Sequence, residues 1–236
     1  MTSGSLRPLR MLFLGAPGSG KGTLTSRLLR AFPQVGSVSS GDLLRQQMAE
    51  KTEIGKLAAE YISRGELLPD EIMTRLLIRE LDSRQWLTSR ATWLLDGFPR
   101  TDIQAISLHS ALKAYNADLN LVVELKVPES VILARIVNRY VHVPSGRVYN
   151  LSYNPPKVPG IDDVTGEPLS RRPDDTAEVF QRRLDKYHAT LKPLREYYAQ
   201  AGILKTVYGE TSNIIFPQLE ALVKDSFAVQ YVAKQI

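Results

Sequence analysis

The chain has 236 residues, a net charge of +5 and enough hydrophobic residues (43%) for one sizeable globular core. It contains no cysteine, which excludes disulfides and thiolate metal sites, and no apolar run approaches the roughly 20 residues that cross a bilayer. Its arginines are spread along the chain beside turns and helix starts and do not form a block. We therefore expect small polyanions as ligands, and neither nucleic acid nor a membrane as partner.

The start of the chain is basic, and its first 41 residues contain no Asp or Glu. An arginine-bearing, acid-poor start is typical of a mitochondrial import signal. A short tail that runs into a phosphate-binding loop would have the same composition, because such loops lack acidic residues. On composition alone the two interpretations are equal.

Residues 15–23, GAPGSGKGT, follow an apolar run at 11–14 and precede a helical pattern. Glycines leave room for a backbone that wraps a polyphosphate, and the helix start adds partial positive charge. Lys21 supplies a mobile ammonium group for the β and γ oxygens. An ordinary glycine-rich turn is the alternative, but four glycines, a proline and a lysine in register favour a phosphate loop.

The residue after Lys21 is Gly22, where the commonest phosphate loops have a serine or threonine that binds Mg²⁺. The hydroxyl comes one residue later, at Thr23. We therefore expect the metal to depend on nucleotide phosphates, water and a carboxylate elsewhere in the chain.

Strand and helix patterns alternate along the chain, which predicts an α/β fold with a five-stranded parallel sheet and helices on both faces. Apolar runs predict the strands, at 10–14, 35–38, 91–95, 119–125 and 204–208. Helical patterns occur at 21–32, 41–63, 69–84, 101–115, 128–139, 175–200 and 211–225.

Residues 140–174 interrupt this alternation with six prolines, three glycines and several β-branched or aromatic residues. No helical period fits them, so we expect a small β-rich insertion, of the kind that forms a lid over an active site. A solvated loop is the alternative, although more than thirty structureless residues would be unusual in a compact domain.

Residues 39–45, SSGDLLR, open a helix directly after the second predicted strand. Hydroxyls, backbone N–H groups and a single cation, Arg45, would suit a monophosphate. Taken alone, the segment is equally a plain helix cap with a surface arginine.

Residues 96–101, DGFPRT, follow a buried strand, so Asp96 emerges at the carboxyl end of that strand, where α/β sheets bind ligands. A carboxylate there can hold Mg²⁺ through water. Arg100 begins the next helix with a fork suited to phosphate oxygens. Gln104, one turn later, can present its amide to the edge of a base.

Four more arginines bracket the insertion. Arg135 and Arg139 lie four apart on a predicted helix, hence on one face, and Arg172 and Arg183 flank its far end. Each alone could be a solvated or salt-bridged residue. Together they favour a closing electrostatic clamp, which phosphoryl transfer requires because its transition state depends on positioned positive charge.

Inside the insertion, His142, Ser145, Asp162 and Thr165 have the spacing of a paired-knuckle zinc site. Without thiolates we expect no zinc, and predict that these side chains hydrogen-bond one another and join two turns.

These motifs resemble those of the adenylate kinase family of long-lid type, over nearly the whole chain. The resemblance implies a phosphate-loop nucleoside-monophosphate kinase fold in a single domain, and no metal in the lid. Its parts would be a core (8–38, 74–139 and 178–225), an AMP-binding arm (39–73), a lid (140–177) and a tail (226–236).

The resemblance also implies roles for individual residues. The donor triphosphate would be bound by Gly18, Ser19, Gly20, Lys21, Gly22, Thr23, Arg135, Arg139, Val148, Tyr149 and Thr211. AMP would be bound by Ser40, Arg45, Glu66, Leu67, Leu68, Gly97, Arg100, Gln104, Arg172 and Arg183. Catalysis would fall to Lys21, Arg100, Arg139, Arg172 and Arg183, with Asp96 ordering the waters of Mg²⁺.

Within the family, segment 202–213, GILKTVYGETSN, is similar to mitochondrial GTP:AMP phosphotransferases, since many relatives that use ATP have lysine in place of Thr211. This likeness implies GTP or ITP as donor, AMP as acceptor and the mitochondrial matrix as location. We expect a monomer. Two alternatives remain: an ATP:AMP kinase of the same fold, and a nucleotide-sensing protein without catalysis. The second would lack Lys21, Asp96 or a clamp arginine, and none is missing.

Overall fold

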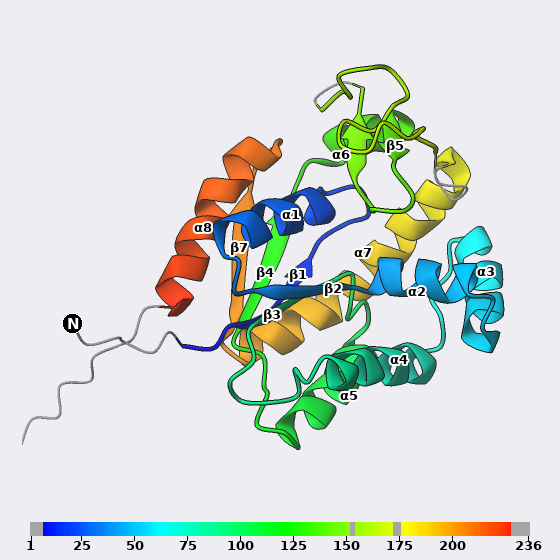
Figure 1. Cartoon of the computed structure of the whole chain (residues 1–236). Coiled ribbons are helices and arrows are strands. Elements are labelled where there is room, and N and C mark those ends of the chain that lie inside the picture. Colours follow the sequence, from blue (N-terminus) through cyan, green and yellow to red (C-terminus); the bar gives the residue numbers. More distant parts are fainter. Residues whose placement is uncertain (1–6, 152–153, 172–175, 228–236) are drawn as a thin grey trace, which may run out of the picture.

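A computed structural model of the chain describes residues 7–151, 154–171 and 176–227. Its centre is the predicted five-stranded parallel sheet, with strand order β2-β3-β1-β4-β7 (Figure 1). The strands are β1 (Arg10–Leu14), β2 (Gly36–Ser39), β3 (Trp93–Asp96), β4 (Leu121–Lys126) and β7 (Leu204–Tyr208). The sheet prediction is confirmed.

The two faces of the sheet are buried by different helices, as the alternation of side chains along β1 illustrates. Met11 and Phe13 pack with α1 (Lys21–Ala31) and α8 (Ser212–Phe227), which lie on one side of the sheet (Figure 1). Leu12 and Leu14 point into the larger core on the other side. That core is closed by α2 (Ser40–Ala49), α3 (Glu53–Arg64), α4 (Asp70–Ser83), α5 (Asp102–Lys113) and α7 (Ala177–Gln200).

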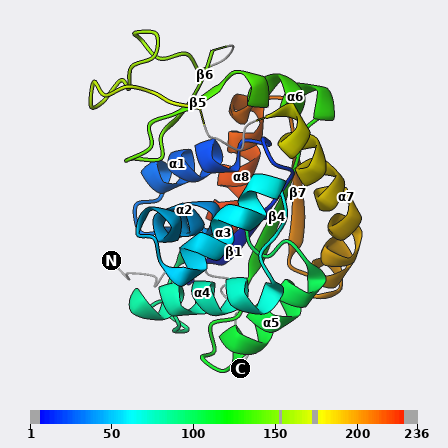
Figure 2. The ribbon, with the colours of Figure 1, turned by 90° about the vertical axis from the view of Figure 1, so that its right-hand side faces the viewer.

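The insertion between α6 (Glu129–Val137) and α7 is β-rich, as predicted. β5 (Arg139–Val141) pairs antiparallel with β6 (Val148–Asn150), and further bridges join Val141 to Ser170 and Ile161 to Pro168. We call its described residues, 139–151 and 154–171, the lid. In both views it lies at the same end of the molecule as α6 and away from α4 and α5 (Figure 1, Figure 2). None of the described helices has the length and apolarity that crossing a membrane requires.

The single helix predicted at 41–63 is wrong, because the structure has two. The chain turns at Lys51, whose φ of 54° is left-handed, and Thr52 then caps α3 by accepting a hydrogen bond from the N–H of Gly55 at 3.0 Å. Gly55 lies against the first helix, and a Cβ there would be 2.0 Å from the carbonyl oxygen of Gln47. The corner between α2 and α3 therefore requires glycine.

The helix predicted at 128–139 is too long at its carboxyl end. α6 ends at Val137, and Arg139 already belongs to the first strand of the lid. Arg135 and Arg139 therefore do not share one helical face. Both nevertheless lie near the phosphate loop, because β5 begins where α6 ends.

Candidate functional site

The motif residues converge where the parallel strands end. In the register of the sheet, Asp96 at the end of β3 is paired with Phe13 of β1 on one side and with Ser39 of β2 on the other. The phosphate loop (residues 15–20) follows β1, and α2 starts directly after Ser39. Carboxyl ends of parallel strands are the usual ligand site of α/β sheets.

The phosphate loop depends on its glycines. Gly18 and Gly20 have φ values of 79° and 92°, which disfavour any residue with a Cβ. A Cβ at Gly18 would also lie 2.9 Å from the side chain of Ile132 on α6. Gly20 is the N-cap of α1 and offers no side chain to the first turn. The free N–H groups of that turn are therefore available to an anion.

Lys21 bends back over this loop. Its ammonium group donates hydrogen bonds to the carbonyl oxygens of Gly15 and Ala16, at 2.8 and 2.9 Å. The Ser19 hydroxyl lies in the same loop; it is buried and has no hydrogen-bond partner among the described residues. A buried hydroxyl without a partner is costly, so a ligand that hydrogen-bonds Ser19 would stabilise this loop.

The charges at this edge are close enough to perturb one another. Removal from water lowers the pKa of Lys21 to about 8; Asp96 opposes this shift, and the positive charges of Arg100 and Arg139 add to it. The protein around the guanidinium likewise lowers the pKa of Arg100, and the charge of Arg183 lowers it further. The positive charges of one lysine and three arginines thus act on one another: Lys21, Arg100, Arg139 and Arg183. Bound anions would reduce this electrostatic repulsion.

Asp96 is the carboxylate among these cations. Its side chain is only 9% exposed, and it makes no hydrogen bond to any residue that the structure describes. Burial raises its pKa, and Lys21 and Arg100 oppose the rise. Across the described ranges, no group of three or more His, Cys, Asp or Glu residues could hold a metal ion. A metal here would have to bring other ligands with it.

A second set of groups lies beside Asp96. The Ser40 hydroxyl donates to the carbonyl oxygen of Gly97 at 2.7 Å, and the guanidinium of Arg100 donates to the same oxygen at 2.7 Å. A Cβ at Gly97 would lie 2.7 Å from the Ser40 oxygen, so glycine is required for this approach. On α2, Arg45 forms an ion pair with Asp42. Its charge also acts on Arg100, which places it within reach of the same region.

Gln104, which we expected to face a base, is nearly fully buried, with 2% of its surface exposed. Its side chain accepts from the backbone N–H of Arg100 at 2.7 Å and donates to Asp70 at 2.8 Å. Asp70 was not among the predicted site residues. Only the packing of α4 against α5 brings it there, and no motif marks it.

Arg135 connects the phosphate loop with the start of α8. Its guanidinium donates to the carbonyl oxygen of Gly18 at 3.4 Å and also to that of Glu210. Thr211 follows directly, is exposed, and caps α8 by accepting from the N–H of Ile214 at 3.3 Å. The predicted donor residue Thr211 thus follows Glu210, which Arg135 links to the phosphate loop. The Thr211 hydroxyl only accepts in the helix cap, so it can still donate a hydrogen bond.

The four polar side chains predicted to join one another in the lid do so. The ring of His142 pairs with the Ser145 hydroxyl at 2.6 Å and with the Thr165 hydroxyl at 3.3 Å, and Thr165 donates to Asp162 at 2.9 Å. A fifth member, Arg147, was not predicted from the sequence; its guanidinium donates to both oxygens of Asp162, at 2.8 and 2.6 Å.

The hydroxyl of Tyr149 also belongs to this network: it donates to Asp162 and accepts from the N–H of Asp163, both at 2.9 Å. Tyr149 is 5% exposed, so little of it is open to a ligand. Its neighbour Val148 is half-buried.

The other predicted site residues differ in how much of each residue a nucleotide could contact. Leu68 is buried in the core, so its backbone alone is available, while Leu67 is half-buried. Glu66 forms an exposed ion pair with Arg64 at 3.1 Å. Gly22 and Thr23 lie in the first turn of α1. Arg172 lies outside the described residues.

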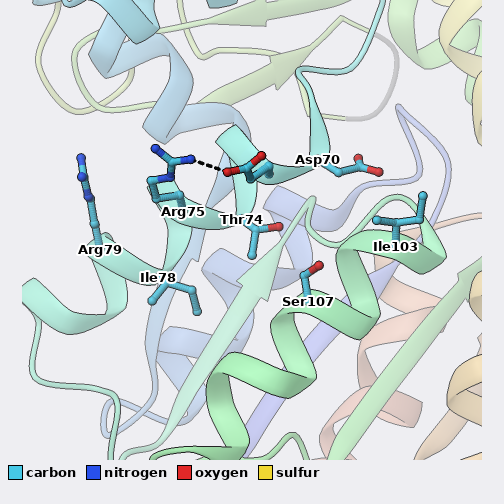
Figure 3. A pocket seen from close by; sticks show the side chains of 8 residues that line it. Asp70, Thr74, Arg75, Ile78, Arg79, Ile103 and Ser107 are labelled. Atoms are coloured by element: carbon cyan, nitrogen blue, oxygen red, sulfur yellow. Dashed lines mark hydrogen bonds and ion pairs between the residues drawn. The ribbon is translucent and has the colours of Figure 1, made fainter.

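A groove of about 370 Å³ lies elsewhere, between α4 and α5 (Figure 3). It is lined by Asp70, Glu71, Thr74, Arg75, Ile78, Arg79, Ile103 and Ser107. Neither Lys21 nor Asp96 is among these residues, so the groove is separate from the charged site. Asp70 lines the groove and also contacts Gln104, which lies beside the charged site.

Comparisons with known proteins agree with this geometry. The family model described as "Adenylate kinase" matches residues 13–203. A protein of Saccharomyces cerevisiae named "GTP:AMP phosphotransferase, mitochondrial" is 61% identical over 222 residues, which cover 94% of this chain and 95% of that protein. A protein of the same name from strain S288c is 63% identical over 211 residues, or 89% and 94% of the two chains. A Drosophila melanogaster protein of that name is 40% identical over 216 residues, or 92% and 95%.

Proposed function

Because the chain belongs to the adenylate kinase family, we propose that it transfers the γ-phosphoryl group of GTP or ITP to AMP, giving GDP and ADP. The names of the three relatives support GTP as donor and AMP as acceptor. The observation that carries the proposal is that the loop lysine, Lys21, lies close to Asp96 and Arg100 at the ends of the parallel strands, where the charge of Arg139 also reaches Lys21. Positive charges that lie close enough to act on one another are what a donor triphosphate and an acceptor monophosphate would neutralise.

We assign the donor to the phosphate loop. Its triphosphate would accept hydrogen bonds from the N–H groups of residues 18–23 and from the Ser19 hydroxyl, which lacks a partner in the described structure. Lys21 would leave the carbonyl oxygens of the loop and turn to the β and γ oxygens. Arg135 and Arg139, where α6 leads into the lid, would also bind the triphosphate. Val148 and Tyr149 of β6 would contact the donor from the lid.

We assign AMP to the opposite side of the cleft. Arg45 and Arg100 would hold its phosphate, with Ser40 and Gly97 beside them, and Gln104 would face its base. The backbone around Glu66, Leu67 and Leu68 would border the nucleoside. Arg183 and Arg172 are also assigned to AMP.

Transfer then requires the two phosphates to meet in line. An oxygen of the AMP phosphate attacks the γ phosphorus, and the bond to the β–γ bridging oxygen breaks, leaving GDP. Negative charge spreads over the oxygens in transit. Positive charge is already positioned there by Lys21, Arg100, Arg139 and Arg183. The transition state can therefore be stabilised without the cost of reorganising water around the transferred group. Closure of the lid would bring Arg139 inward and exclude water.

The residues present fit a magnesium ion that arrives with the nucleotide. Asp96 is a buried carboxylate with no hydrogen bond among the described residues, and it would hold the ion through water. When bound, Mg²⁺ neutralises part of the charge on the β- and γ-phosphates. No zinc is assigned to the lid, where Asp162 and His142 already have hydrogen-bond partners.

The relatives are named mitochondrial, which supports a mitochondrial location, and we assign this protein to the matrix. The nucleotides are its assigned partners, and we propose that it acts as a monomer. We propose that its basic residues bind the phosphates of these nucleotides and not nucleic acid or a membrane surface.

The test of this function is a product analysis. Purified protein incubated with GTP, AMP and Mg²⁺ should form GDP and ADP in equal amounts, and omission of either substrate should stop both. Formation of GDP and inorganic phosphate without ADP would instead indicate a GTP hydrolase. No turnover at all would support the nucleotide-sensing alternative.

Lys21 predicts a pH dependence of donor binding. Its pKa of about 8 in the free protein means that it loses its charge as pH rises through 8. Because a bound triphosphate favours the ammonium, binding at pH 8 should take up about half a proton, and affinity should fall above pH 8. Calorimetry of a non-hydrolysable GTP analogue in two buffers of different ionisation enthalpy measures this uptake. Equal apparent enthalpies in both buffers, or the same uptake by Lys21→Met, would contradict the prediction.

We predict that Thr211 contributes to the preference for GTP and ITP over ATP. Guanine and hypoxanthine both have an acceptor at position 6, which the Thr211 hydroxyl can meet, whereas adenine has a donor there. Thr211→Val should lower kcat/KM for GTP and ITP together by about tenfold, the effect of one hydrogen bond of ~1.4 kcal/mol, and leave ATP unchanged. Thr211→Ser keeps both the hydroxyl and the cap of α8 and serves as control. An equal loss for all donors would assign Thr211 to the helix cap alone.

A further inference from the structure

Asp70 joins the first turn of α4 to the first turn of α5. Its two carboxylate oxygens accept hydrogen bonds from the amide nitrogen of Gln104 at 2.8 Å and from the Thr101 hydroxyl at 3.1 Å. Thr101 is itself the N-cap of α5 and accepts from the backbone N–H of Gln104 at 3.1 Å. In Figure 3 Asp70 extends from α4 toward the start of α5, close to Ile103.

The two partners of the Gln104 amide determine which way it faces. A carboxylate can only accept, so Asp70 requires the NH₂ end, and a backbone N–H can only donate, so Arg100 requires the oxygen. A reversed amide would bring two acceptors together at Asp70 and two donors together at Arg100. Gln104 is 2% exposed, so water has little room to relieve either mismatch.

The amide therefore has one N–H and one oxygen lone pair left. Those two groups match the Watson–Crick edge of adenine, whose N1 accepts and whose 6-amino group donates. Hypoxanthine and guanine reverse both positions and would require the reversed amide. We infer that Asp70 is a specificity-determining positioning residue, which selects adenine as the acceptor base by holding Gln104 in the orientation that fits it.

This inference rests on the proposed function, in which Gln104 faces the base of AMP. It adds a residue that does not itself touch the nucleotide. Asp70 acts through Gln104, and its position on a different helix means that the selection depends on the packing of α4 against α5. Both helices contribute buried leucines to the same core, Leu77 and Leu81 from α4 and Leu108 and Leu112 from α5.

The chain provides a matched control at the next position. Glu71 has the same charge in the same first turn of α4, but it is 84% exposed and pairs with Arg75 at 2.6 Å. The dashed line from Arg75 in Figure 3 marks this ion pair. Glu71→Ala therefore reproduces any effect on the helix dipole or net charge without touching Gln104.

The experiment measures kcat/KM for AMP and for IMP as acceptors, with GTP saturating. Asp70→Ala should lower the value for AMP by about tenfold or more, mainly through KM, and leave IMP nearly unchanged. The AMP-to-IMP ratio should thus fall about tenfold, while Glu71→Ala keeps the ratio of the unaltered protein. A loss of stability alone would lower both acceptors equally and leave the ratio unchanged, and that result would overturn the inference.

Two further variants keep the test decisive if Asp70→Ala folds poorly. Asp70→Asn keeps the size of the side chain but can offer Gln104 either an oxygen or an NH₂ group, so the ratio should fall, less than with alanine. In a Gln104→Ala background, adding Asp70→Ala should not change the ratio further, because the residue it positions is gone. A full additional loss in that background would mean that Asp70 acts independently of Gln104, and would refute the inference.

The failure of the inference can be told apart from failure of the function. If the unaltered protein does not phosphorylate AMP, the proposed function is wrong. If it does so, and Asp70→Ala and Asp70→Asn both keep its preference for AMP over IMP, the function stands and the role of Asp70 falls.

Discussion

Lys21→Met should abolish most phosphoryl transfer, lowering kcat by about 10²- to 10³-fold while the protein stays folded. Methionine keeps the length of the side chain and removes the charge that is aimed at the β and γ oxygens. The Lys21 hydrogen bonds to Gly15 and Ala16 are lost as well. That loss is offset in part, because the surroundings lower the pKa of Lys21 and so disfavour its charged form in the folded protein.

Steady-state kinetics, together with thermal unfolding, measure this effect. Lys56→Met is the control, since Lys56 pairs with Glu53 on the exposed side of α3. Its kcat should equal that of the unaltered protein. A Lys21→Met variant that is well folded and turns over at a near-normal rate would refute the assignment of the phosphate loop.

Arg100→Ala should weaken AMP binding much more than donor binding. Arg100 donates to Gly97 in the free protein, and the positive charges of Arg183 and Arg45 act on it, so a bound phosphate would be attracted to this position. Removing one partner of a desolvated charge pair costs about 2–5 kcal/mol, or at least thirtyfold in affinity for AMP. The donor, bound by the phosphate loop on the other side of Asp96, should lose far less.

Separate titrations of AMP and of a non-hydrolysable GTP analogue decide this point. Arg79→Ala provides the control, because Arg79 lies on α4 at the groove shown in Figure 3, away from the cleft. Equal losses of both nucleotides in Arg100→Ala would mean that Arg100 serves no particular subsite.

The centre of the sheet could be predicted from the sequence because β1, β3 and β4 are apolar runs buried on two faces. The edge strands β2 and β7 are only partly buried and gave weaker signals. The phosphate loop and the DGFPRT segment could be placed for the same reason, since each directly follows such a run. Parallel pairing then brings their ends together without further information. The lid network was predictable in outline from the spacing of His142, Ser145, Asp162 and Thr165.

What the sequence could not supply were contacts that depend on how elements pack. The corner between α2 and α3 is set by the left-handed Lys51 and by the contact of Gly55 with Gln47, although Thr52 and Gly55 together were a readable signal of a new helix start. The end of α6 was misplaced because Arg139 continues a helical spacing while its backbone pairs with Asn150. Asp70 was missed because its spacing from Gln104 in the chain reveals nothing about α4 lying against α5.

The central claim is that this protein uses GTP to phosphorylate AMP, and a competition experiment tests it most directly. Equal concentrations of GTP and ATP are supplied with limiting AMP and Mg²⁺, and the initial consumption of each donor is followed by chromatography. A site built for guanine leaves buried groups unpaired against adenine, each costing roughly 1–3 kcal/mol, so GTP should be consumed at least about a hundredfold faster. Consumption of ATP at the same rate as GTP, or faster, would contradict the assignment and make the protein an ATP:AMP kinase of the same fold.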